Sequence, residues 1–156
     1  MAPTKVSTAP VKRRSRDVFT AAKRSEVMSH IRAKHTKPEI AVRRVLHALG
    51  YRFRLHDPKL PGRPDIILRK YHLIIEVNGC FWHRHHCLKG RMPVGNHRYW
   101  VRKLNTNKLR DRRNARRLRS LGWHVATIWE CDVRRWTPAR LREVLARVMR
   151  RCSAIQ

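Results

Sequence analysis

The chain has 156 residues, and its 38 Lys and Arg far outnumber its 10 Asp and Glu, which gives a formal net charge of +28. This length fits one domain of ordinary size. So high a charge opposes folding by self-repulsion. Nucleic acid is the partner expected to offset it, with an anionic membrane surface as the alternative. No apolar run approaches the roughly 18 residues of a membrane span, and the N-terminus lacks the apolar segment of a secretory signal. We expect a cytoplasmic protein that binds nucleic acid and no membrane.

The N-terminal third predicts a tail and two helices. Residues 1–18 contain two prolines and a basic run, which predicts a disordered tail ahead of a single domain over residues 19–156. Apolar residues at helical spacing predict a first helix over 20–32. Thr36 and Glu39 have the spacing of a capping box, so a second helix is predicted to begin there and to end at the next glycine.

The rest of the chain predicts a sheet covered by helices. Four segments have alternating or continuous apolar residues, which is typical of strands. One long basic helix and one C-terminal helix accompany them. We therefore expect an α/β domain in which helices cover both faces of a mixed central sheet of about four strands. The predicted strands are 51–55, 65–68, 73–77 and 123–129, and the predicted helices are 97–121 and 137–151.

Two carboxylates stand at the second and third predicted strands. Asp65 begins one strand, and Glu76 lies inside the next. If these strands pair as a hairpin, both carboxylates approach one end of the sheet. There, with a phosphate, they form a hard oxygen site suited to Mg²⁺, which could activate water for attack on a phosphodiester. A turn residue and a solvent-facing edge charge are the alternative interpretations. The pattern resembles the Pro-Asp and Glu-X-Lys of restriction-type nucleases, but Asn78 stands in place of the lysine.

Two cysteines and three histidines crowd into residues 80–87. Because no secretory signal is apparent, a metal site is expected rather than disulfides. Structural zinc takes four Cys or His ligands. Free thiols with surface histidines are the alternative. His83 remains outside the predicted set, either as a general base or proton shuttle or as a packing residue. The predicted zinc ligands are Cys80, His85, Cys87 and Cys131.

Aromatic residues lie next to basic ones in the same region. Phe81 and Trp82 belong to the Cys/His loop, and Tyr99 and Trp100 begin the long basic helix. Apolar side chains of this kind can enter between base pairs and unstack them, while packing in the core is the alternative. The basic helix predicts DNA binding through phosphates, with steep salt dependence.

Together these residues resemble the very-short-patch (Vsr) repair endonucleases, from about residue 24 to residue 145. The resemblance implies an enzyme that nicks DNA beside the thymine of a T·G mismatch left by deamination of 5-methylcytosine. It also implies Mg²⁺ as catalytic cofactor and a restriction-endonuclease-like fold with structural zinc. The motifs that carry the resemblance are 60–65, 79–83, His85 with Cys87, Asn107 with 110–113, and 121–123 with 129–131.

The resemblance also implies roles for single residues. Asp65 becomes the central Mg²⁺ ligand, His83 activates water, and Glu39 is a supporting acid as well as a capping residue. The same four zinc ligands follow. The residues implied to touch the DNA or lie close to the site are Met28, Phe81, Trp82, Trp100, Asn107 and Asp111.

Two departures from the family concern the strand before the Cys/His loop. Where family members can carry a catalytic histidine, this chain has Asn78. The family can use a main-chain carbonyl as a metal ligand, here that of Val77, and Glu76 adds a carboxylate that some members lack. Either Glu76 or the Val77 carbonyl is therefore expected to complete the Mg²⁺ shell.

The resulting expectation is a monomeric, nucleoid-associated bacterial endonuclease that acts on mismatched double-stranded DNA and contacts mismatch-repair proteins. Two alternatives stay open. One is a restriction-type or nicking nuclease that acts on intact duplex, and the other is a catalytically impaired DNA-binding module held together by zinc.

Overall fold

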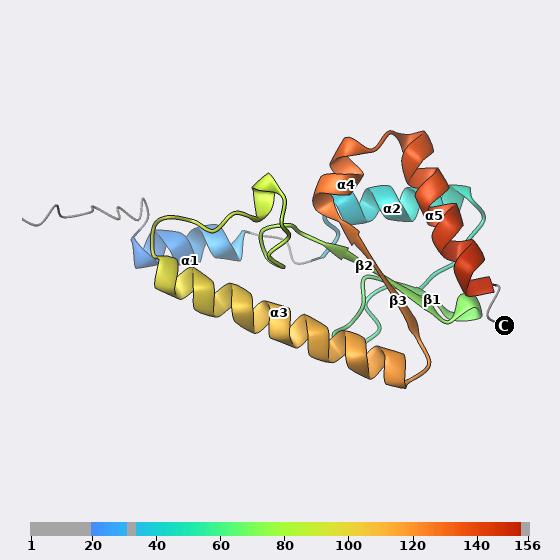
Figure 1. Ribbon diagram of the computed structural model, residues 1–156, viewed down its shortest axis with the longest axis horizontal. Coiled ribbons are helices and arrows are strands. Elements are labelled where there is room, and N and C mark those ends of the chain that lie inside the picture. Colours follow the sequence, from blue (N-terminus) through green and yellow to red (C-terminus); the bar gives the residue numbers. More distant parts are fainter. Residues whose placement is uncertain (1–19, 31–33, 154–156) are drawn as a thin grey trace, which may run out of the picture.

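The computed structural model describes residues 20–30 and 34–153, so the tail predicted over 1–18 lies outside the described residues. The chain forms five α-helices, three strands and two short 3-10 turns in these ranges, and Figure 1 shows their arrangement. The elements are α1 (Ala21–Ser29), α2 (Lys37–Ala48), β1 (Ile66–Leu68), η1 (Arg69–Tyr71), β2 (Leu73–Asn78), η2 (Leu88–Gly90), α3 (His97–Ser120), β3 (His124–Trp129), α4 (Glu130–Arg135) and α5 (Pro138–Ser153).

The sheet has three strands in the order β1-β2-β3, with β2 in the middle. β1 and β2 form the predicted antiparallel hairpin around η1, with Ile66 opposite Ile75. β2 and β3 run parallel, so that Asn78 at the end of β2 lies beside Trp129 at the end of β3. This parallel pairing brings the segments that follow both strands to the same edge of the sheet.

The strand predicted over 51–55 is wrong, and the described sheet has three strands rather than about four. Only Arg54 pairs with the sheet, through a single bridge to Ile67. The alternation of Tyr51, Phe53 and Leu55 still reports burial, because all three side chains pack against the core. No strand forms because β1 has only three residues, and beyond the bridge the backbone N–H of His56 donates one further hydrogen bond of 3.0 Å to the backbone oxygen of Pro64.

Helices cover both faces of the sheet, as predicted. On one face, the buried apolar side chains of α2 and α5 pack against Ile66, Leu68 and Ile75. On the other, Leu118 of α3 packs against Ile67 and Ile74, and Figure 1 shows α3 on the side of the sheet away from α2 and α5. Because side chains alternate along a strand, the face of β2 that carries Ile74 also carries Glu76 and Asn78.

The start of α2 confirms the predicted capping box. The Thr36 side chain accepts a hydrogen bond from the backbone N–H of Glu39, and the Glu39 side chain accepts one from the backbone N–H of Thr36. The helix ends where Gly50 adopts a φ of 83°, a conformation that glycine takes without strain. Within residues 20–30 and 34–153, none of the helices combines the length and hydropathy that crossing a bilayer requires.

Candidate active site

Asp65 and Glu76 meet at one end of the sheet. Asp65 directly precedes β1, and Glu76 directly follows Ile75, the partner of Ile66. Extending the hairpin by one step therefore sets the two side chains on the same face, and the charge of Asp65 acts on Glu76. Asp65 Oδ2 accepts a hydrogen bond of 2.8 Å from the backbone N–H of Val77. The expected approach of the two carboxylates is confirmed. Because β2 is the central strand, Glu76 is not an edge charge.

Both carboxyl groups have raised pKa values, chiefly because they are buried. Burial, followed by the negative charge of Asp65, raises the pKa of Glu76 from 4.5 to about 7. Burial also raises the pKa of Asp65, although its hydrogen bond from Val77 works in the opposite direction. Two adjacent half-buried carboxylates with raised pKa values are an arrangement that a divalent cation would relieve.

An imidazole is held next to these carboxylates by α3. His83 Nδ1 lies 2.5 Å from Asp111 Oδ2, and Asp111 also contributes to the raised pKa of Glu76. Burial would raise the pKa of Asp111, but the hydrogen bonds and charges of His83 and Arg110 together lower it. A carboxylate on Nδ1 makes that nitrogen the donor and leaves the lone pair on Nε2, the arrangement of a positioned general base.

Glu39 reaches the same site from α2 through residues that the sequence analysis missed. It is 2% exposed and forms an ion pair with Arg43, one helical turn further along. Glu39 Oε1 also lies 3.1 Å from His56 Nε2, and His56 Nδ1 lies 3.9 Å from Asp65 Oδ1. One carboxylate thus caps α2 and joins the site. The i,i+4 spacing of Glu39 and Arg43 is a sequence signal for this pair, whereas no signal pointed to His56.

The four predicted zinc ligands form one compact cluster. The ligand atoms of Cys80, His85, Cys87 and Cys131 all lie within 4.8 Å of one another. Cys131 Sγ is 3.4 Å from His85 Nδ1, and the backbone N–H of Cys131 points to Cys80 Sγ at 3.3 Å. A tetrahedral zinc with bonds of roughly 2.0–2.3 Å places its ligand atoms about 3.5–4 Å apart. The donor set and its spacing therefore fit this ion.

The thiols of this cluster differ in their surroundings. Burial raises the pKa of Cys80 to about 12, whereas hydrogen bonding with His85 leads the causes that lower the pKa of Cys87 to about 6. The ring of His85 stacks on Trp129 at 4.3 Å between centroids. Cys152 is buried in the core cluster instead, away from these four residues.

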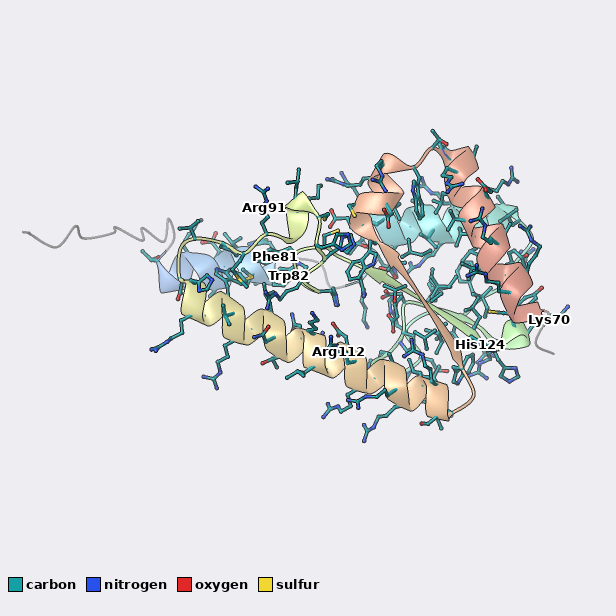
Figure 2. The ribbon with its side chains drawn as sticks, viewed as in Figure 1. Lys70, Phe81, Trp82, Arg91, Arg112 and His124 are labelled. Carbon is teal, nitrogen blue, oxygen red and sulfur yellow. The ribbon has the colours of Figure 1, made fainter. Side chains whose placement is uncertain are left out.

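The predicted aromatic wedge is a packed group. Phe81 lies 5.0 Å from both Trp82 and Trp100 between ring centroids, and Figure 2 shows Phe81 and Trp82 beside the N-terminal half of α3. Trp100 is 8% exposed, so packing accounts for much of its surface, while Phe81 and Trp82 are half-buried. Asn107 donates a hydrogen bond of 3.3 Å to the backbone oxygen of Trp82, which fixes the loop against α3.

The remaining predicted contact residue, Met28, lies half-buried on α1, a helix separate from the aromatic group. The structure therefore brings Asp65 and Glu76 together, joins His83 to Asp111, and gathers the four Cys/His residues into one cluster.

The sequence of this chain is similar to those of known DNA endonucleases. The model of the family described as DNA mismatch endonuclease Vsr matches residues 16–89. The type II nicking enzyme V.XorIIP of Xanthomonas oryzae pv. oryzae is 43% identical over 131 residues, which are 83% of this chain and 96% of that protein. The type II nicking enzyme V.NmeAIP of Neisseria meningitidis is 42% identical over 134 residues, 86% of this chain and 94% of that protein. DNA mismatch endonuclease Vsr of Escherichia coli K12 is 41% identical over 118 residues, 76% of each chain.

These relatives define the class of protein: the chain is a DNA endonuclease of the nicking type. More specifically, it belongs to the Vsr family.

Proposed function

We propose that this chain is a Mg²⁺-dependent endonuclease that nicks one strand of duplex DNA beside the thymine of a T·G mismatch. The observation that carries the proposal is the meeting of Asp65 and Glu76 at the end of the β1–β2 hairpin, next to a histidine that Asp111 holds at 2.5 Å. Metal-binding carboxylates beside a positioned imidazole are the parts needed to hydrolyse a phosphodiester.

In this proposal the cation is held by Asp65 together with Glu76 or the carbonyl of Val77. When bound, Mg²⁺ supplies polarisation of the phosphate and lowers the pKa of water. The chain then moves the proton: His83 accepts it from the attacking water at Nε2, and Asp111 stabilises the imidazolium that forms. Glu39 has the role of a supporting acid. Its carboxylate contacts His56 and so holds that imidazole beside Asp65.

Two observations support the proposed specificity for mismatched DNA. They are the aromatic group of Phe81, Trp82 and Trp100 and the name of one relative. The relative from Escherichia coli is named a DNA mismatch endonuclease. Phe81 and Trp82 are half-buried, so part of each side chain stays accessible to enter a base step that a mismatch has weakened. Trp100 supports them from α3. Met28 would approach the other groove. We propose that the enzyme acts as a monomer.

The Cys/His cluster is proposed to hold one structural Zn²⁺ that ties the loop after β2 to α4. Metal analysis of the purified protein should then find about one equivalent of zinc per chain. Cys131→Ser should lose the zinc and much of its stability, because removal of a ligand couples to unfolding. Cys152→Ser, outside the cluster, should keep the metal. Equal zinc content in both variants would contradict the assignment.

A strand-nicking assay tests the function. A T·G duplex and a T·A duplex of the same sequence are incubated with the enzyme, with and without Mg²⁺. Nicking only of the T·G duplex, and only with Mg²⁺, is expected. Asp65→Asn and His83→Ala should abolish nicking while the thermal unfolding temperature stays close to that of the wild type.

Two relatives are named type II nicking enzymes, which supports a second candidate function. Equal cutting of the T·G and T·A duplexes would favour a nicking nuclease that acts on intact DNA. A wild-type protein that binds DNA but never cuts it would favour a binding module.

A further inference from the structure

A pocket of about 270 Å³ lies between α3 and the Cys/His loop, directly beside the proposed catalytic groups. Asn78, His83 and Asp111 line this pocket together with three cations, which are Lys108 and Arg112 from α3 and Arg84 from the loop. Arg112 is labelled at the middle of α3 in Figure 2. The pocket thus joins the site of proton transfer to a concentration of positive charge.

The cations on α3 are available to a ligand. Asp111 and Arg112 follow Lys108 by three and four residues, so both neighbour Lys108 on the surface of the helix. Asp111 is engaged by His83 and Arg110. Among residues 20–30 and 34–153, neither Lys108 nor Arg112 forms an ion pair. Two uncompensated cations lining one pocket favour an anionic ligand.

The same pocket is lined by Asn78, the residue of β2 that stands where the restriction-type pattern has a lysine. Asn78 lies two residues after Glu76 on β2, so both side chains project from one face of the strand. A lysine at this position would reach a phosphate bound to the cation that the carboxylates would hold. An uncharged asparagine can only hydrogen-bond. The site therefore needs a cation from another element, and Lys108 lines the same pocket as Asn78.

We propose that Lys108 is a catalytic residue whose ammonium group binds a non-bridging oxygen of the scissile phosphodiester, with Arg112 holding an adjacent phosphate. The inference rests on the proposed function of the site. Attack by water adds negative charge to the phosphate oxygens in the transition state. A cation already in place stabilises that charge without reorganising. Lys108 thus supplies from a helix the charge that Asn78 does not supply from the strand.

Lys108→Gln tests the proposal, with Arg142→Gln as the matched control. Arg142 is an exposed residue of α5, on the opposite face of the sheet, and its replacement removes the same charge. The measurements are the single-turnover nicking rate at saturating enzyme, the Kd for the duplex without Mg²⁺, and the thermal unfolding temperature. Loss of one charge-stabilising contact predicts a rate about 100-fold lower for Lys108→Gln. Its Kd should rise less than about five-fold, and Arg142→Gln should nick at the wild-type rate.

A wild-type rate in Lys108→Gln at saturating enzyme would overturn the proposal, even if its Kd rose, because Lys108 would then be an ordinary backbone contact. So would an equal loss of rate in Arg142→Gln. The assay uses both the T·G and the T·A duplex. If the wild type cuts the two equally, mismatch specificity fails, while the variant comparison still tests Lys108 on either substrate. A wild type that cuts neither overturns both proposals.

Discussion

Replacing Glu76 with glutamine should stabilise the metal-free protein and impair the enzyme. The pKa of Glu76 is raised from 4.5 to about 7, first by burial and then by Asp65. Between these two values the folded state holds a proton that the unfolded state has released. Stability therefore falls as the pH rises through this window. A shift of this size corresponds to roughly 3 kcal/mol at pH 8, which Glu76→Gln should recover.

Urea unfolding at pH 5 and pH 8, in buffer free of Mg²⁺, measures this effect. The two proteins should be nearly equally stable at pH 5, and Glu76→Gln should be more stable at pH 8. Mg²⁺ should then stabilise the wild type more than the variant, because the cation binds the folded carboxylate. Glu143→Gln on α5 is the control. Hydrogen bonding to Arg140 leads the causes that lower the pKa of Glu143, so its replacement should not stabilise. A variant no more stable than the wild type at pH 8 would refute the reasoning.

Three further predictions concern the core, the metal loop and DNA binding. Leu145→Ala should cost about 2–5 kcal/mol in urea unfolding, because Leu145 is 0% exposed under the sheet. Leu109→Ala, at a 65% exposed site, should cost less than about 0.5 kcal/mol, and similar losses would contradict the described core. Gly90→Ala should distort the Cys/His loop and lower the bound zinc, because an added Cβ overlaps the backbone oxygen of His85; an unchanged zinc content would count against the loop geometry. In DNA titrations, log K should fall by about 0.9 per contacted phosphate per log unit of salt, and a flat profile would exclude binding led by phosphates.

Much of the site could be predicted because its residues cluster near each other in sequence. Asp65, Glu76 and the loop at 80–87 all belong to one hairpin and its exit, and hairpin register follows from apolar pattern. Cys131 was predicted to be a zinc ligand from its residue type. Its approach to the Cys/His loop depends on the parallel pairing of β2 and β3, a long-range contact that no local pattern fixes. The short helix α4, in which Cys131 lies, was not predicted because six residues show too little periodicity.

The residues that escaped prediction act across elements. His56 joins Glu39 of α2 to Asp65 at the start of β1, yet in sequence it is one histidine in a turn. Lys108 was indistinguishable from the other cations of the basic helix until the structure placed it in the pocket with Asn78. The alternation over 51–55 predicted burial correctly and pairing wrongly, because alternation records which side is buried and not whether a strand partner is present.

The most direct measurement is a mapping of the nick on duplexes labelled at the 5′ end of either strand and resolved on a denaturing gel. The wild type with Mg²⁺ should give one product, from the strand that carries the mismatched thymine, cut beside that base. Asp65→Asn should give none. Cuts in both strands, cuts that also appear in the T·A duplex, or cleavage that persists without a divalent cation would contradict a metal-dependent mismatch-nicking enzyme built on Asp65 and His83.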